Sequence, residues 1–499
     1  SRSQAFLLED LYLEDLNDNL ILSTENSIGL NLYRRSIQNK YSQISNPVFQ
    51  YIDYIGQLNQ IKNSKIISKN DPTNRKTDEL NESMLLKALE EIRRNNLEDD
   101  DFQDFLKEDY LGNFSGEYIN QALSNDEVLL SFFDDPLLPT LIVHNSDRTF
   151  TIPLVGLVTN ALNITAYIDD FLQFKEIDGF RPIDFDSELA SIYHDATFGF
   201  LEQYNFFRDS DTHAVNKIYI HTTGGFDDLP FSALYDPRSE KFLIEKYEIN
   251  YIPDQLSFLM LSEGKRLSPG SNFIGIGDPS LNGTSLNTEF DNLFNRRGEV
   301  DYEAINELAS LPSTGEELKA ISKLFYSSSV YLREQADEGL LGDYLNNDAD
   351  IISFATHAIE NFSEETYEVG LVLSPPERNS SDDGILTRGE ISKLNLIDNP
   401  TIVLSACNTS RGLFSGASKY SGLTSGFLEA GAGGLIVSSW DLETNSARDL
   451  SVLAHKISIK KGISIGSGYR QAMIEFIRNP KYKNYSHPYF WAGFQVIGK

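Results

Sequence analysis

Two stretches decide the fold of this chain, ADIISFATHA at residues 349–358 and PTIVLSACNT at residues 400–409. Each is an apolar run of strand length that ends in a reactive side chain, His357 in the first and Cys407 in the second. Further apolar runs of this length lie at residues 271–279, 329–334 and 433–441. Because helical or loop segments separate the runs, they predict an α/β fold with a parallel sheet covered by helices on both faces.

The helical segments between these strands are recognisable from their spacing. STGEELKAISKLF at residues 313–325 has helical periodicity, and Ser313 or Thr314 is placed to start it with a capping box. We therefore expect the sheet to be built from strand, helix, strand units. In such sheets the functional residues lie just beyond the carboxyl ends of the strands.

The pattern of helix-like and strand-like runs divides the chain into three regions. Residues 1–115 contain helical spacing, as in LLKALEEIRRNNL, interrupted by a polar breaker. Residues 116–265 carry short β-rich runs and an amphipathic stretch, and residues 266–499 alternate strands and helices more regularly. A chain of 499 residues exceeds a single core, so we predict a helical N-terminal region, an α/β region and a C-terminal α/β domain.

The amino-acid composition argues against two classes of binding partner. The net charge of -32, from 74 acidic and 42 basic residues, disfavours direct binding to nucleic acid or anionic lipid. No stretch approaches the roughly 20 apolar residues that span a bilayer, and the acidic start is unlike a signal peptide, so we expect a cytoplasmic protein. Because the chain starts at Ser1 and not at methionine, we expect that residues upstream of it were removed.

The reactive side chains have a defined chemistry. A single cysteine cannot form an intrachain disulfide, which leaves the Cys407 thiol free. If the two strands are parallel neighbours, His357 lies at the same sheet edge and can act as its general base. No metal-ligand spacing and no phosphate-binding glycine pattern occurs, so we expect neither a metal nor another cofactor.

An ordered series of motifs gives the pair its specificity. Residues from about 217 to 499 resemble the CHAT domain family, caspase-like cysteine peptidases of clan CD. The resemblance is carried by DDLPFSAL (227–234), LPSTGEELKAI (311–321), IISFATHA (351–358), DGILTRGEISKLNL (383–396), TIVLSACNTS (401–410), GFLEAGAGGLIVSSW (426–440) and HPYFWAGFQVIGK (487–499). It implies a caspase-like parallel-sheet sandwich covered by helices, preceded by a degenerate caspase-like half that starts near residue 116.

The resemblance also assigns roles. His357 and Cys407 match the catalytic histidine and the nucleophile, and their separation of 50 residues agrees with the caspase pattern. The oxyanion would be held by the backbone amides of Cys407 and Ala358. Two positions depart from the family pattern, because Ala358 replaces the usual glycine and Asn408 follows the nucleophile in place of threonine.

The strand after the nucleophile's strand is expected to wall the substrate pocket. Trp440 would supply an apolar wall, with Asp441 and Glu443 following it. If Asp441 points into the pocket, its carboxylate favours Arg or Lys at P1. If Asp441 instead caps the next helix, the pocket is apolar and takes a residue such as Leu.

The resemblance therefore implies a cysteine endopeptidase that cleaves specific protein substrates and is regulated by its N-terminal region, an upstream domain or an activating protein partner. An alternative is a caspase-like interaction scaffold that has lost turnover through the changes at Ala358 and Asn408. A glutaminase or other acyl transferase would share the chemistry but lacks the resemblance. Bacterial members of the family are associated with defence and programmed cell death.

Overall fold

The computed structural model describes most of the chain after residue 115. The described residues are 116–134, 139–154, 187–199, 201, 208–209, 213–284, 302–345, 348–362, 367–375, 383–405, 422–440 and 442–499, with scattered residues between 32 and 96. The predicted helical region 1–115 therefore lies mostly outside the described residues. Those of its residues that are described, such as Arg35 and Tyr51, are almost all helical.

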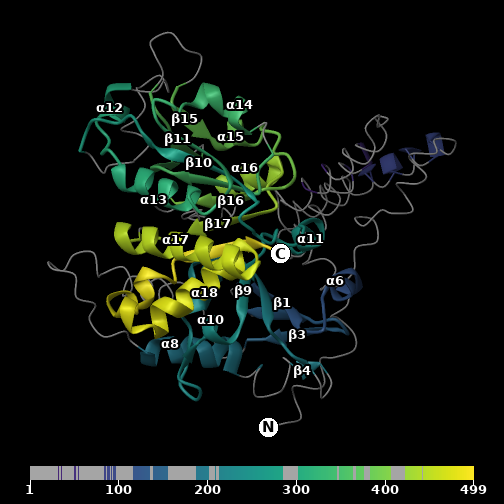
Figure 1. Cartoon of the computed structure of the whole chain (residues 1–499). Coiled ribbons are helices and arrows are strands. Elements are labelled where there is room, and N and C mark those ends of the chain that lie inside the picture. The colour runs from purple at the N-terminus through teal and green to yellow at the C-terminus, as the bar shows by residue number, and fades with distance from the viewer. Residues whose placement is uncertain are drawn as a thin grey trace, which may run out of the picture.

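One large mixed sheet forms the centre of the molecule (Figure 1). Its C-terminal strands are β10 (Asn272–Pro279), β11 (Ser327–Arg333), β12 (Ile351–Ala355), β16 (Thr401–Leu404), β17 (Gly434–Ser438) and β18 (Phe494–Gly498). Its earlier strands are β1 (Glu127–Phe133), β2 (Thr140–His144), β3 (Thr149–Pro153), β6 (Lys217–Thr222) and β9 (Glu248–Tyr251). The order is β11-β10-β12-β16-β17-β18-β9-β6-β1-β2-β3.

Most neighbouring strands in this sheet are parallel. The pairs β10·β11, β10·β12, β12·β16 and β16·β17 are all parallel, as are β1·β6 and β6·β9. These strands are almost continuously buried, except for the edge strand β11. The predicted α/β fold is confirmed.

The two α/β regions share this sheet. β18 pairs antiparallel with β17 and parallel with β9, through Ile497 and Tyr251. The Asn250 side chain reinforces the junction by donating to the Gly498 carbonyl at 3.1 Å. Strands 217–222 and 127–133 therefore extend the C-terminal sheet directly.

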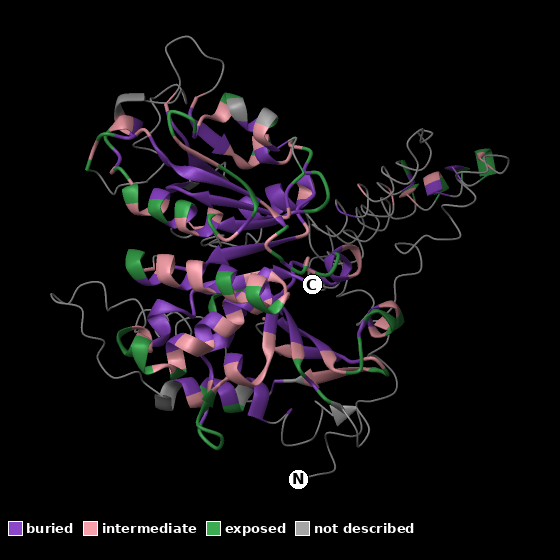
Figure 2. Cartoon of the chain, viewed as in Figure 1, coloured by how far each residue is buried: buried purple, intermediate pink, exposed green. Residues whose placement is uncertain are grey.

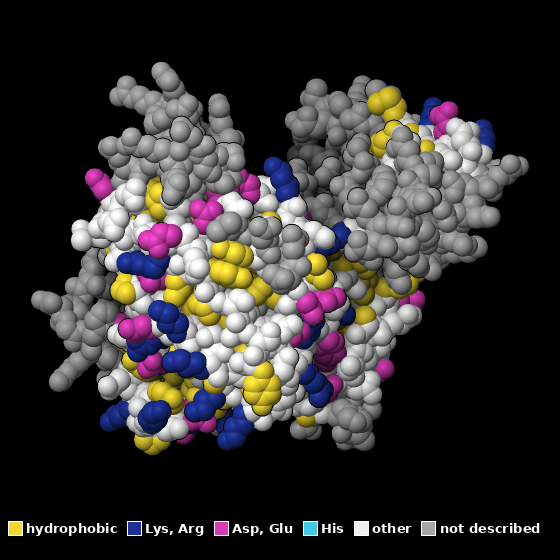
Figure 3. All heavy atoms as spheres, turned by 45° about the horizontal axis from the view of Figure 1, so that its top comes forward, with side chains coloured by type: hydrophobic (Ala, Val, Ile, Leu, Met, Phe, Trp, Pro, Cys, Tyr) yellow, Lys and Arg dark blue, Asp and Glu magenta, His cyan; other side chains and the backbone are white. Residues whose placement is uncertain are grey.

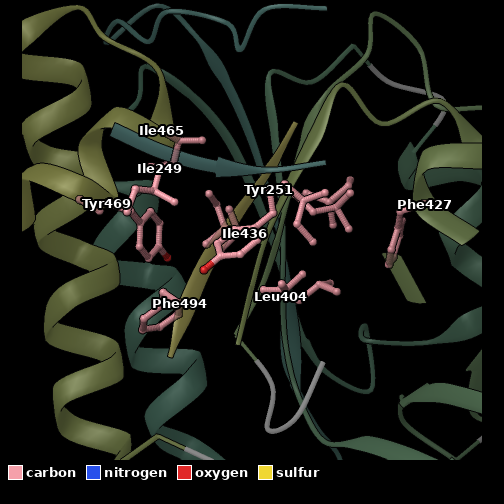
Figure 4. Packing of buried hydrophobic residues seen from close by; sticks show 14 of the residues in the cluster. Ile249, Tyr251, Leu404, Phe427, Ile436, Ile465, Tyr469 and Phe494 are labelled. Carbon is pink, nitrogen blue, oxygen red and sulfur yellow. The ribbon is translucent and has the colours of Figure 1, made fainter. Parts of the chain in front are cut away.

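Helices cover both faces of the sheet. α13 (Pro312–Ser322) packs on β10 and on α17 (Thr444–Lys461), which packs on α18 (Ile465–Arg478). Figure 4 shows Tyr469 of α18 on one side of the strands and Phe427 of α16 (Leu423–Ala430) on the other, with Leu404 and Ile436 between them. The strands carry most of the buried residues, and the exposed residues lie on the outer helices and loops (Figure 2).

Smaller elements surround this core. A three-stranded sheet consists of β13 (Ala358–Phe362), β14 (Tyr367–Val372) and β15 (Ile385–Thr387). The remaining α-helices of the described residues from 116 onward are α6 (Gly116–Ala122), α8 (Ser187–His194), α10 (Leu243–Lys246), α11 (Gln255–Met260), α12 (Tyr302–Asn306), α14 (Leu341–Leu345) and α15 (Arg388–Ile391).

One predicted helix start is wrong. α13 begins at Pro312 with Leu311 as its N-cap, and no side chain caps it. Proline is favoured in the first helical turn because it needs no amide partner there. The Thr314 hydroxyl donates to the Leu311 carbonyl at 2.8 Å and accepts from the Asp278 amide at 3.2 Å, so it ties the helix to the end of β10.

The described surface carries charges of both signs. On the face seen in Figure 3, Lys and Arg side chains lie among Asp and Glu side chains. The acidic excess of the whole chain is thus not gathered on the described part of this face. Among the helices that the structure describes, none has the length and apolar character needed to cross a bilayer.

Candidate active site

His357 is held where the central sheet meets the small sheet. It lies two residues beyond the end of β12 and directly before β13. Its carbonyl accepts from the Val372 amide at 2.9 Å, and the preceding Thr356 hydroxyl donates to the Val372 carbonyl. Only 8 % of His357 is exposed. The backbone on both sides of the imidazole is therefore fixed.

The imidazole has an orienting partner that the sequence did not indicate. Nε2 of His357 lies 2.8 Å from the carbonyl oxygen of Ala309, which can only accept. Nε2 therefore carries the proton and Nδ1 is the basic nitrogen. Burial lowers the pKa of His357 below its usual value, and the bond to the Ala309 carbonyl acts in the opposite direction. Burial thus favours the neutral ring, which is the form that a general base needs.

The segment that holds Ala309 is itself tightly seated. Gly283 and Ala309 form a parallel β-bridge, and the Gly283 amide donates to the Leu308 carbonyl at 3.1 Å. A Cβ atom on Gly283 would lie 1.8 Å from the Glu307 carbonyl oxygen. Only glycine allows this approach, so Gly283 sets the position of the carbonyl that orients His357.

The strand that leads to Cys407 is the parallel neighbour of the strand that leads to His357. β12 and β16 pair with Phe354 opposite Leu404, and the Ser405 amide donates to the Phe354 carbonyl at 2.8 Å. His357 and Cys407 each follow their member of this pair by three positions in the sequence. The condition on which the dyad was predicted, that the two strands are parallel neighbours, is therefore met, while Cys407 itself lies outside the described residues.

A buried glutamate side chain contacts the residue that follows β16. Glu317 of α13 is 4 % exposed, and its Oε2 lies 3.2 Å from the Ser405 hydroxyl. Neither residue was singled out from the sequence. A signal was present, since Glu317 lies four positions before Ile321 on the apolar face of the helix.

Ala358 opens β13 directly after His357. It is 7 % exposed and pairs with Leu371 of β14. It is not among the non-glycine residues with positive φ, so alanine is accommodated here without backbone strain. Its role in holding an oxyanion stays a prediction.

Of the three residues predicted to line the substrate pocket, Trp440 and Glu443 are described, and each contacts a different part of the structure. Trp440 is 3 % exposed, and its indole Nε1 donates to the Tyr489 carbonyl at 3.1 Å. Glu443 is the N-cap of α17, and its carboxylate accepts from the Asn445 and Ser446 amides at 3.0 and 2.8 Å. Asp441 lies outside the described residues. The N-cap position of α17, which one alternative gave to Asp441, is occupied by Glu443.

The comparisons with known proteins concern this C-terminal part most directly. The model of the CHAT domain matches residues 192–499, more than half of the chain. No curated protein matches the chain. Among solved structures it is similar to the Saccharomyces cerevisiae separase–securin complex at 12 % identity and a TM-score of 0.43, covering 95 % of this chain and 38 % of the matched one.

A second group of solved structures is that of the gingipains. The chain is similar to the Arg-specific cysteine proteinase gingipain R at 12 % identity and a TM-score of 0.37, covering 68 % of this chain and 75 % of that one. A complex of Porphyromonas gingivalis RgpB pro- and mature domains gives 11 % identity and a TM-score of 0.36, covering 67 % and 76 %. This chain spans about two fifths of the matched chain in the separase complex. By the family match, and in agreement with the motifs around His357 and Cys407, the chain belongs to the CHAT domain family.

Proposed function

We propose that this protein is a cysteine endopeptidase that cleaves protein substrates with Cys407 as nucleophile and His357 as general base. The observation that carries the proposal is the buried imidazole of His357, which is oriented through Nε2 by the Ala309 carbonyl and lies just beyond the end of β12, the strand that pairs with the one leading to Cys407. A nucleophile, a base and a group that orients the base are the parts that nucleophilic catalysis requires.

The reaction divides into two steps. His357 Nδ1 takes the thiol proton, and the thiolate attacks the scissile carbonyl to give a tetrahedral intermediate whose oxyanion faces the Ala358 and Cys407 amides. The imidazolium then protonates the departing amine, leaving a thioester on Cys407. Water, deprotonated by the same imidazole, attacks the thioester and releases the carboxylate product and the thiol.

We extend the proposal to regulation by the N-terminal region. Arg35 Nη1 donates to the Glu429 carbonyl at 2.6 Å, near the last residue of α16, and Nη2 reaches Asn395 Oδ1 at 3.3 Å. A cation at a helix C-terminus is favourable because the last carbonyls have no intrahelical partner. α16 directly follows the segment that contains Cys407. The N-terminal region, or a protein partner that displaces it, would therefore change the position of that segment through the Arg35 contact with α16.

Covalent labelling tests the catalytic proposal. The chain has one cysteine, so a peptidyl acyloxymethyl ketone has one thiol to modify. We expect one adduct on the intact protein, none with Cys407→Ala, and strongly reduced labelling with His357→Ala. A chain that binds protein partners but is never labelled, with or without them, would instead be the interaction scaffold.

A further inference from the structure

The burial of the Glu317 side chain is energetically unfavourable. The residue is 4 % exposed, on the face of α13 that packs against the sheet and α17. A carboxylate removed from water is costly unless it is paired or hydrogen-bonded. The described partners are few: the Ser405 hydroxyl at 3.2 Å, with Ser451 and Arg448 of α17 nearby.

The position of Ser405 gives this burial a consequence. Ser405 is the first residue after β16, its amide is fixed to the Phe354 carbonyl, and it precedes Cys407 by two positions. Glu317 therefore fixes the side chain of the residue at which the chain leaves the sheet toward the nucleophile. The backbone bond alone would hold the strand end but not the Ser405 side chain.

Residues 309–317 contact the general base as well as the segment of the nucleophile. Ala309, whose carbonyl orients His357, lies eight residues before Glu317, and α13 begins between them. The two contacts of this segment thus reach both strand ends of the site. A displacement of α13 would change the two sides of the dyad together.

We propose that Glu317 is a positioning residue for the nucleophile, acting through the Ser405 hydroxyl on the segment that carries Cys407. This inference rests on the proposed function, since it assumes that the Cys407 thiol must be aligned with His357. Glu317 does not touch the substrate. It sets the starting point of the nucleophile segment and remains inside the protein.

The local charges make this contact sensitive to pH. Burial raises the pKa of Glu317 to about 7, against smaller opposing effects from Ser451, Ser405 and the Arg448 guanidinium. Among the described residues, the Tyr469 phenol of α18 also interacts with Glu317, and its own pKa is raised by burial and by the Glu317 charge. Near neutral pH the Ser405 hydroxyl thus faces either a carboxylate, which accepts strongly, or a neutral carboxyl.

The test measures alkylation of the single thiol by iodoacetamide between pH 5 and 9, in the full chain and in Glu317→Ala, Glu317→Gln and Ser405→Ala. A free thiol gives a midpoint near pH 8.5, so an aligned dyad reacts faster than that profile at pH 6. We expect Glu317→Ala and Ser405→Ala each to lose up to about tenfold at pH 6, where the Glu317 carboxyl is mostly neutral, which is the upper size of one hydrogen bond between neutral groups. Glu317→Gln should stay within about threefold, because its amide oxygen still accepts.

The matched control is Glu316→Ala, which removes the neighbouring carboxylate, 72 % exposed and 3.6 Å from Arg448, and should leave the profile unchanged. The Glu317→Ala/Ser405→Ala double variant should lose no more than either single variant, since both changes remove the same contact. Thermal melts verify folding, and the Ser405 variant keeps the test valid if Glu317→Ala does not fold.

The outcomes separate the two proposals. Wild-type alkylation profiles in Ser405→Ala and in a folded Glu317→Ala would overturn the positioning role, even where the peptidyl electrophile labels Cys407. Losses that are additive in the double variant would also overturn it. A shifted profile in these variants, in a chain that the peptidyl electrophile never labels, would support positioning and overturn the peptidase.

Discussion

The Nε2 atom of His357 and the carbonyl oxygen of Ala309 lie 2.8 Å apart, although 48 residues separate them in the sequence. This bond decides which imidazole nitrogen carries the proton. It depends on the segment before α13, which rests against the backbone at Gly283. The alignment of the base can therefore be altered by a substitution that touches neither His357 nor Cys407.

Gly283→Ala should misalign the base. Its new Cβ would lie 1.8 Å from the Glu307 carbonyl oxygen, so the 307–309 backbone must shift and move the Ala309 carbonyl. A displacement of about 1 Å can reduce a catalysed rate about 100-fold. We expect a loss of that order in labelling by the peptidyl electrophile, measured as a second-order rate constant on intact protein.

Gly342→Ala is the matched control, because nothing lies within 4 Å of a Cβ atom built there. It should label at the wild-type rate. If Gly283→Ala folds, as judged by circular dichroism, and also labels at that rate, the Ala309 carbonyl is not needed to orient the imidazole.

The strands around the site and their parallel direction could be predicted from the sequence, whereas their order in the sheet comes from the structure. β12 and β16 are short runs of buried apolar residues, and such strands separated by helices pair in parallel. This places His357 and the segment of Cys407 at neighbouring strand ends. The helix start at Ser313 or Thr314 was predicted wrongly because Pro312 takes the first helical position and the Thr314 hydroxyl serves β10 instead.

Other parts of the site could not be predicted, for physical reasons. The partner of His357 is a backbone carbonyl, and any residue type could supply it at position 309. The junction of β18 with β9 joins strands more than 240 residues apart through backbone bonds and the Asn250 side chain. Glu317 was more accessible to prediction, because an acidic residue on the apolar face of a helix is unusual.

Glu317 should also make the free energy of unfolding depend on pH. Burial raises its pKa to about 7 in the folded protein from a usual value of 4.5, so between these pH values the unfolded chain ionises first. The free energy of unfolding then decreases as pH rises through this window, by about 3 kcal/mol for this group. Glutamine does not ionise, so Glu317→Gln should gain about that amount over the wild type between pH 4.5 and pH 8.

Urea denaturation at the two pH values measures this difference. Glu316→Gln, at the exposed neighbouring position, serves as the control and should show little change, because exposed charges contribute little. A Glu317→Gln difference that is constant with pH would mean that the carboxyl is already ionised in the folded protein at pH 4.5.

Arg35 provides a test of regulation. Its guanidinium covers the C-terminal end of α16, where a Cβ on Gly431 would lie 2.2 Å from Nη2. Arg35→Ala removes a contact worth about 1 kcal/mol, by the scale of cations at helix C-termini. If the contact keeps the site latent, a coupling of that size raises the basal labelling rate of Cys407 about fivefold.

The control for this prediction is Arg34→Ala, which removes the adjacent positive charge. Labelling is measured with the peptidyl electrophile in the absence of any partner. A rate for Arg35→Ala at or below the wild-type value would contradict a restraining role, and an equal increase in Arg34→Ala would point to net charge instead of this contact.

The choice of residue at P1 can be decided by two neighbouring acids. Glu443 supplies the helix cap, since its carboxylate accepts from the Asn445 and Ser446 amides, so Asp441 is not needed for that purpose. We therefore expect Asp441 to favour Arg or Lys at P1 by a charge-assisted hydrogen bond, beside the apolar Trp440. A P1-varied peptide library should show a basic preference that disappears in Asp441→Asn. Glu443→Gln should lower stability by about 1 kcal/mol, as for a weakened N-cap, while the basic preference remains. A preference for Leu or Met that persists in Asp441→Asn would instead establish an apolar pocket.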